Sequence, residues 1–121
     1  MTPRPPQSRR GDQLRVADME HSAALLDEVR KMGRSRFLSE RILQDAAIRR
    51  FEALGEAAGH VSKRTREAFP KIEWSKMRGF SSFAKHEYWR LDLERVWAAI
   101  EEMPSLRREL AKVRLDHRRG D

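Results

Sequence analysis

The stretch QDAAIRRFEALGEAAGHVS (residues 44–62) decides the fold class, because it carries the clearest apolar period in the chain. Its apolar side chains recur at i, i+4, i+7, i+11 and i+14, the spacing of one face of an α-helix. They are Ala47, Phe51, Leu54, Ala58 and Val61. We therefore expect a central helix over about 39–61, with this stripe packed against other helices.

The segment before this stretch predicts another helix, from Asp12 to about Met32. Asp12 is a suitable N-cap residue, and Gly33 is suited to ending the helix. Five residues at roughly helical spacing are expected to face inward: Leu14, Ala17, Ala24, Leu25 and Val29.

The segment after it begins with a short basic helix, capped by Ser62 and ended near Phe69 by Pro70. A longer helix follows over IEWSKMRGFSSFAKHEYW (residues 72–89), and its apolar side is expected to hold Met77, Phe80, Ala84 and Tyr88. The opposite side is small and polar, with Ser75, Gly79, Ser82 and His86. Small side chains permit close approach, so we expect this face to meet a second helix or a symmetry mate, with His86 at the contact.

Two more helices complete the chain. Asp92 caps the first, and Pro104 and Ser105 open the last. Their inward stripes are expected to be Leu93, Val96, Trp97 and Ile100, then Leu106, Leu110 and Val113. No strand-like alternation appears. The sequence predicts an all-α antiparallel bundle of four main helices with one or two short ones. We expect one domain over 12–115, between a disordered basic tail (1–11) and a polar C-terminal tail (116–121).

The net charge of +7 is unevenly distributed. Residues 61–90 hold eight of the basic residues and only three acidic ones. A surface of this kind attracts phosphate backbones or an acidic partner, although it can also be a solvated face. The candidate nucleic-acid-binding residues are Lys76, Arg78, Lys85 and Arg90.

Several classes of site are not expected. The chain has no cysteine, which excludes disulfides and thiolate metal sites. Its four histidines lack the spacing of a metal site, so we predict neither a metal nor a cofactor. No segment is apolar enough to span a membrane, and the N-terminal arginines are followed by no apolar stretch of a secretory signal. We therefore expect a cytoplasmic protein.

Two stretches resemble a known family. Residues 44–62 are similar to the central-helix signature of the HepT-like proteins, a branch of the HEPN ribonuclease superfamily. FPKIEWSKMRGFSSFAKHEYWRLDLERVW (residues 69–97) resembles the Pro-x-Ile-x-Trp, Gly-Met-Arg-Asn-x-x-x-His-x-Tyr and Asp-Leu-x-x-Val-Trp motifs of the same family. The order and spacing agree over roughly residues 12–115.

The resemblance implies a homodimeric toxin that acts beside a minimal nucleotidyltransferase antitoxin. It implies metal-independent RNA cleavage by an Arg-x4-His motif, with two copies facing each other across the dimer cleft. It also implies that the antitoxin can attach AMP to the Tyr of His-x-Tyr. Counted from Trp74, His86 and Tyr88 fall at the family's His and Tyr.

The catalytic arginine of the family is missing, because Ser81 stands at its position and Ser82 at the usual Asn. RNA cleavage without metal needs a proton-transfer group, which His86 can supply, and a cation for the developing phosphate charge, which Ser81 cannot. Arg78 lies eight residues before His86, and Lys85 points about 100° away on an ideal helix. Replacement of the arginine by either residue would need a helix break or a second subunit.

The alternatives for individual residues stay open. His86 can be catalytic or structural, and Tyr88 can be a packed residue or an AMP acceptor. At the level of the whole protein, three hypotheses remain: a HepT-like ribonuclease toxin with impaired activity, a catalytically inactive partner of a nucleotidyltransferase, and a basic helical dimer that binds nucleic acid non-specifically.

Overall fold

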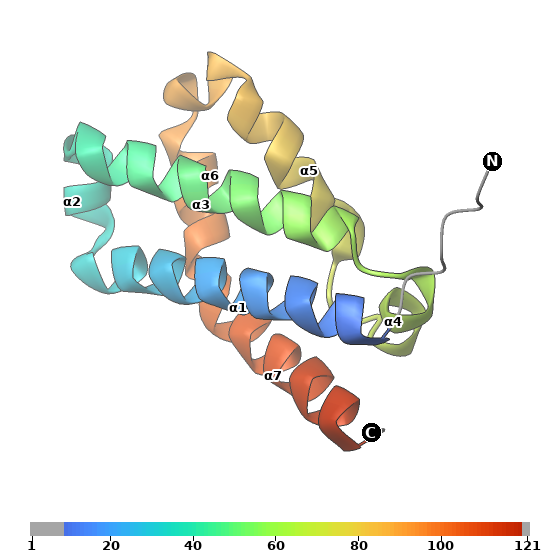
Figure 1. The fold of residues 1–121 in the computed structure, drawn as a ribbon. Helices are drawn as coiled ribbons and strands as arrows, with labels where there is room; N and C mark the ends of the chain where they lie inside the picture. Colours follow the sequence, from blue (N-terminus) through green and yellow to red (C-terminus); the bar gives the residue numbers. More distant parts are fainter. Residues whose placement is uncertain (1–8, 120–121) are drawn as a thin grey trace.

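The computed structural model describes residues 9–119, apart from the side chains of Arg9, Glu87 and Tyr88. Among these residues there is no strand, and the chain forms eight helical elements (Figure 1). They are α1 (Arg9–Met32), α2 (Arg34–Ser39), α3 (Arg41–Gly59), α4 (Lys63–Ala68), α5 (Trp74–Lys85), the 3-10 helix η1 (Glu87–Leu91), α6 (Leu93–Glu101) and α7 (Met103–Arg119). The predicted all-α class is confirmed.

The long helices lie side by side in the order α5, α3, α1, α7, from the top to the bottom of the view in Figure 1. Helix α6 crosses behind α1 and α3 and contacts α1. The short helix α4 lies at the end of the bundle where α1 begins and α7 ends. The pair α1 and α3 therefore forms the centre, with α5 and α7 on its two sides.

Local signals in the sequence place several of the helix ends correctly. Gly33 follows α1 with a φ of 101°, a left-handed conformation that glycine adopts without steric cost. The Ser62 side chain accepts a hydrogen bond from the Thr65 N–H at the start of α4, and Asp92 does the same for Arg95 at the start of α6. These caps confirm the predicted starts of both helices.

The core is built largely from the predicted stripes. All five residues of the predicted central stripe are buried, four of them on α3 and Val61 just after its end. Val96, Trp97 and Ile100 on α6 and Leu106, Leu110 and Val113 on α7 are buried as well. Leu93 is only partly buried. The central stretch that decides the fold class therefore also supplies the middle of the core.

The predicted inward face of α1 was wrong. Leu14 is 63% exposed and Ala17 is exposed, while Ala24 and Leu25 are only partly buried. Of the five predicted residues only Val29 is buried, and the other core positions of α1 are Val16, Met19, Ala23 and Leu26. The buried face also includes the polar residues Asp12, Ser22 and Asp27. A prediction based on apolar residues alone therefore chose the wrong side of the helix as the inward face.

Three boundaries also differ from the sequence prediction. Residues 34–39 form the separate helix α2, so the central helix starts at Arg41. Helix α1 already begins at Arg9, and α7 continues to Arg119 with His117 buried. The rest of the expected tails, residues 1–8 and 120–121, lies outside the described residues.

The predicted helix over 72–89 is divided in the structure. Helix α5 ends at Lys85, His86 adopts an extended conformation with φ −93° and ψ 130°, and η1 follows. His86 and Tyr88 therefore do not continue the helical faces on which the sequence placed them. No helix in the described part of the chain is both long and apolar enough to cross a membrane.

Candidate active site at the end of helix α5

Helix α5 is held very close to the central helix. A Cβ atom at Gly55 of α3 would lie 2.4 Å from the Ser81 backbone nitrogen and 2.8 Å from the Met77 carbonyl oxygen. Real Cβ atoms do not approach other atoms so closely, so the contact requires glycine at position 55. The backbone around the candidate motif is thus fixed against α3.

Ser81, at the position where the sequence motif was expected to have arginine, lies on the side of α5 that faces this contact. Its Cβ atom would be 3.0 Å from a Cβ at Gly55, and the residue is half-buried. A serine here has no charge and little reach. The structure therefore places no cation at this motif position.

His86 lies at the junction between α5 and η1. Its backbone N–H donates a hydrogen bond of 3.2 Å to the Phe83 carbonyl, while its side chain is exposed. An exposed imidazole at a helix end is accessible to a phosphodiester. The predicted polar face is also open, because Ser75, Gly79 and Ser82 are all exposed.

Three of the four candidate nucleic-acid-binding cations pair with carboxylates. Lys85 Nζ lies 3.9 Å from Glu56 of α3, and Arg90 lies 3.7 Å from Asp45. The Arg90 guanidinium also stacks 4.7 Å from the centre of the Trp89 ring. These pairs lower the charge that the motif region presents to an anion.

Lys76 has the shortest of these contacts, since its Nζ donates hydrogen bonds of 2.7 and 2.8 Å to Glu102, the residue that follows α6. Arg78 is exposed and has no carboxylate partner among the described residues. It lies on the same flank of α5 as Lys85, two turns earlier. Arg78 is therefore the candidate cation best able to meet an anion near α5.

Tyr88 is the candidate AMP acceptor. Its backbone belongs to η1, but its side chain lies outside the described residues. The neighbouring Trp89 is buried and anchors η1 to the core. The acceptor role of Tyr88 stays a prediction.

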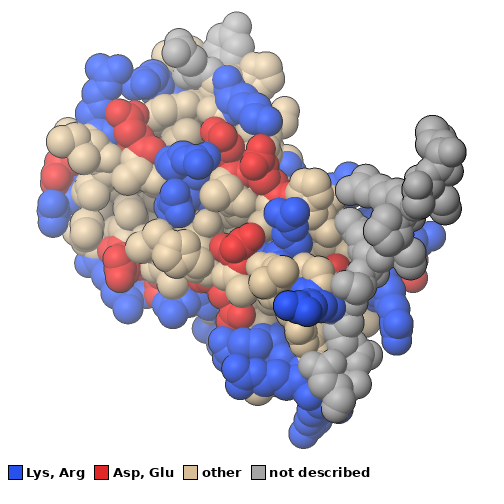
Figure 2. All heavy atoms as spheres, viewed as in Figure 1, with Lys and Arg blue, Asp and Glu red and all other residues tan. Residues whose placement is uncertain are grey.

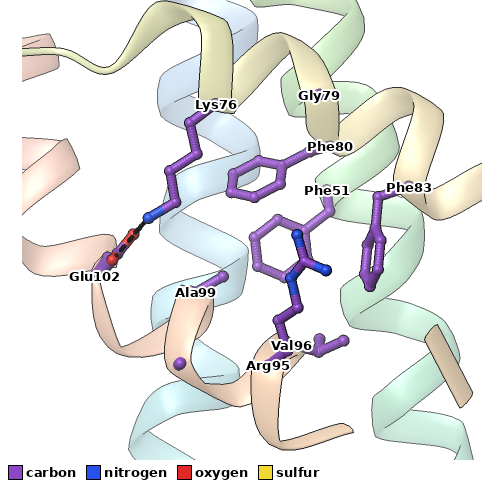
Figure 3. Close-up of a pocket in the computed structure, with 10 residues that line it drawn as sticks. Phe51, Lys76, Gly79, Phe80, Phe83, Arg95, Val96, Ala99 and Glu102 are labelled. Atoms are coloured by element: carbon purple, nitrogen blue, oxygen red, sulfur yellow. Dashed lines mark hydrogen bonds and ion pairs between the residues drawn. The ribbon is translucent and has the colours of Figure 1, made fainter. Parts of the chain in front are cut away.

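A pocket of about 350 Å³ lies on the other flank of α5, between α5 and α6 (Figure 3). Phe51 and Phe80 meet edge to face with ring centres 4.7 Å apart, and the Arg95 guanidinium lies 5.1 Å from the centre of Phe83. The Lys76–Glu102 pair spans one end of the pocket.

Sequence reasoning missed this pocket. Phe80 and Phe83 are visible in the motif, but no periodic signal shows where α6 lies relative to them. No group of three His, Cys, Asp or Glu residues suited to a metal ion occurs within residues 9–119 as described.

These features define an all-α protein with an exposed histidine at the end of a helix that is fixed against the central helix. A family model described as "Ribonuclease HepT-like" matches residues 19–113. The chain belongs to this HepT-like ribonuclease family.

Three curated relatives that match this chain over most of their own length are the following. The "Probable ribonuclease HepT" of Thermococcus cleftensis is 28% identical over 101 residues, 82% of this chain and 92% of that protein. "Putative RNase MJ1380" of Methanocaldococcus jannaschii is 25% identical over 93 residues, 76% of this chain and 85% of the relative. "Putative RNase TTE0752" of Caldanaerobacter subterraneus is 27% identical over 90 residues, 74% of this chain and 80% of the relative. No solved structure gives a significant match.

Proposed function

We propose that this protein is a HepT-like endoribonuclease of the toxin–antitoxin type, in which His86 moves protons during metal-independent RNA cleavage. The observation that carries the proposal is the exposed imidazole of His86 at the α5 end of a HepT-like fold. Histidine suits this role because its ordinary pKa is near neutrality. The attacking group would be the 2′-hydroxyl of the RNA itself.

The nuclease is expected to be weak. Loss of one preorganised donor at a developing oxyanion typically lowers the rate by about 10²–10³. Ser81 is an uncharged, half-buried residue, so it does not replace the guanidinium of the family motif. Arg78, without a carboxylate partner among the described residues, is the side chain that can partly compensate by attracting RNA.

The proposed assembly is a homodimer with a minimal nucleotidyltransferase as its antitoxin. The exposed face with Ser75, Gly79, Ser82 and His86 supports the dimer, because small residues permit two helices to approach closely. The two His86 side chains would then face a shared cleft. Tyr88, two residues after His86, is the proposed site of AMP attachment by the antitoxin.

A second candidate function is a binding module that keeps the fold and the nucleotidyltransferase partner but does not cleave RNA. Two observations favour it: Ser81 stands where the arginine is needed, and Lys76, Lys85 and Arg90 are already paired with carboxylates. Under this hypothesis His86 is a residue of the dimer contact.

Incubation of the purified protein with a fluorescent RNA and a metal chelator tests the two functions. Slow cleavage by the wild-type protein that is lost in His86→Ala supports the nuclease. His21→Ala is the matched control, because His21 is an exposed histidine on α1. If the wild-type protein gives no cleavage above the His86→Ala level, the nuclease is excluded.

A further inference from the structure

The end of the bundle farthest from α2 carries a group of cations that the motif does not use. Helix α4 and residues 112–119 of α7 contain seven Lys or Arg residues and two acidic ones. The cations are Lys63, Arg64, Arg66, Lys112, Arg114, Arg118 and Arg119. Figure 2 shows Lys and Arg gathered along α7 at the bottom of the view.

Three of these cations, Lys63, Lys112 and Arg114, pair with the carboxylates of Glu67, Glu109 and Glu20, and the other four differ from them. Arg64, Arg66, Arg118 and Arg119 have no ion pair with a carboxylate among the described residues, whereas Lys76, Lys85 and Arg90 all do. An anion that approaches α5 must compete with those carboxylates. An anion that approaches the α4–α7 end meets unpaired guanidinium groups, which bind phosphate through two parallel hydrogen bonds.

A hollow of about 550 Å³ lies within this charged end. It is lined by Phe69, at the end of α4, and by residues of the last turns of α7, namely Lys112, Leu115, Asp116, Arg118 and Arg119. Phe69 is only partly buried and Leu115 is 53% exposed, so the hollow has an apolar wall open to solvent. An apolar, aromatic wall beside unpaired cations is the pattern of sites for single-stranded nucleic acid.

The two sides of the hollow are fixed to each other by buried polar contacts. The Thr65 hydroxyl of α4 donates a hydrogen bond of 2.5 Å to Asp12 of α1 and lies 3.4 Å from His117 Nε2 of α7. Asp12 is 2% exposed and His117 is 4% exposed. The cations of α4 and α7 therefore project from a preorganised base.

We propose that this α4–α7 groove binds single-stranded RNA. The groove is the hollow lined by Phe69, Leu115, Arg118 and Arg119, together with the unpaired Arg64 and Arg66 on the adjoining helix α4. Phosphates lie on the guanidinium groups, and an unstacked base lies against the Phe69 ring. The inference rests on the proposed function only in naming RNA as the polyanion. It adds a docking surface separate from His86, which positions the substrate without taking part in cleavage.

Two other roles for these residues explain less. Arg118 and Arg119 stabilise the negative end of the α7 dipole, but that role needs neither the cations of α4 nor Phe69. An acidic protein would use the cations and gain little from the exposed ring, whereas bases stack on aromatic side chains. RNA uses both the unpaired arginines and the aromatic wall of the groove, and only the lining carboxylate of Asp116 opposes it.

The test measures the binding of a labelled 12-nucleotide single-stranded RNA to the full chain carrying His86→Ala, at several salt concentrations. Two double variants remove the proposed contacts: Arg64→Gln with Arg66→Gln, and Arg118→Gln with Arg119→Gln. Each is expected to weaken binding at low salt by at least about ten-fold. Each should also reduce the slope of log K against log salt by about 1.4, or about 0.7 for each lost phosphate contact on a single strand.

The matched control is Arg36→Gln with Arg41→Gln, which removes the same charge at the α2–α3 junction. Helix α1, of 24 residues and about 36 Å, separates this junction from the groove. The control should lower affinity much less than either groove variant. Phe69→Leu should lower the affinity for single-stranded RNA by about five-fold or more, which is the lower end of the range for the loss of one stacked base. The affinity for heparin, which has no bases, should stay unchanged.

Three results would overturn the proposal. They are an equal loss in the α2–α3 control, loss of binding only when Arg78→Gln is introduced, and equal affinity for poly-glutamate of the same charge. Binding in the His86→Ala background is independent of cleavage. A wild-type protein that binds RNA through the groove but never cuts it would refute the proposed nuclease and support the groove.

Discussion

The missing side chain at Gly55 sets the distance between α3 and α5. Gly55→Ala adds a methyl group that would lie 2.4 Å from the Ser81 nitrogen, so the two helices must separate. We expect a loss of about 1–3 kcal/mol in the free energy of unfolding, although alanine alone favours a helix by about 1 kcal/mol. Urea denaturation measures this change.

Gly59 is the matched control, because nothing lies within 4 Å of a Cβ at this position and the residue is also in α3. Gly59→Ala is expected to be neutral or to stabilise the protein by up to about 1 kcal/mol. If both substitutions had the same effect, the close approach of α3 and α5 would not be the cause.

The second residue-scale prediction concerns Ser81. Ser81→Arg restores a guanidinium whose long stem can leave the half-buried position and reach solvent. We expect RNA cleavage to rise by about 10²–10³-fold, measured as the initial rate with a quenched fluorescent RNA. Ser82→Arg adds the same charge one residue later, on an exposed part of the helix. An equal gain in Ser82→Arg would show that general attraction of RNA, and not the motif geometry, is responsible.

The roles of the candidate site residues stay predictions, but the structure corrects the arrangement that the sequence suggested for them. Spacing from Trp74 identified Ser81 and His86, but the end of α5 at Lys85 was missed, because no Pro or Gly marks the break in KHEYW. The carboxylate partners of Lys85 and Arg90 lie on α3, far away in the sequence. Such pairing depends on tertiary contacts and leaves no local signal.

At the scale of elements, the attachment of α7 to α1 depends on Asp27. This carboxylate is 4% exposed and accepts hydrogen bonds of 2.6 Å from Arg30 on α1 and 2.7 Å from Arg107 on α7. Burial alone would raise the pKa of Asp27, but the two arginines more than offset it, so the pKa lies below its ordinary value.

Asp27→Asn is expected to lower the free energy of unfolding at pH 7 by about 1–2 kcal/mol, a modest value because both arginines are partly solvated. A lowered folded-state pKa stabilises the protein fully above the unfolded-state pKa, near 3.8, and this contribution is lost as the pH falls through the folded value. The difference from wild type should therefore shrink in acid. Urea denaturation of both proteins from about pH 2.5 to about pH 7, a range that spans the titration of aspartate, measures this difference in the free energy of unfolding.

Glu28→Gln is the control for Asp27→Asn, since Glu28 is the next residue on α1 and is exposed. It should change the stability by less than about 0.5 kcal/mol at any pH. A difference for Asp27→Asn that persists undiminished in acid would contradict the assigned role of the ion pairs.

The elements show where sequence reasoning succeeds and where it fails. The stripe on α3 and the stripes on α6 and α7 were predicted because their buried positions are almost all apolar. On α1, Asp12, Ser22 and Asp27 occupy the buried face, and their satisfaction depends on distant residues such as Thr65 and Arg107. A prediction from apolar spacing assigns polar residues to the solvent-exposed face, so it misplaces polar residues that are buried.

At the scale of the whole molecule, one buried network joins three segments. Asp12 of α1 accepts hydrogen bonds from the Ser62 N–H at 2.9 Å, the Ser62 hydroxyl at 2.5 Å and the Thr65 hydroxyl at 2.5 Å, and Thr65 contacts His117. Thr65→Val keeps the shape but removes a donor from a buried carboxylate. We expect a loss of about 1.5–3 kcal/mol in urea denaturation.

Thr65→Ser keeps the hydroxyl and is expected to retain most of this stability. Hydrogen exchange should show that Thr65→Val exposes the amides of α4 and of the end of α7 more than those of α3. Equal loss in both variants would assign the effect to the methyl group and not to the hydrogen bond.

The same network brings the beginning of α1 and the end of α7 together, since the Gln13 side chain donates a hydrogen bond of 3.5 Å to the His117 carbonyl. A bulky label attached at the exposed Arg10, near the start of α1, would therefore stand at the same end of the bundle as Phe69 and the C-terminal arginines. It would leave His86, on the far side of the bundle, unobstructed. If RNA binds in the proposed α4–α7 groove, this label should lower the affinity for RNA without changing cleavage at His86.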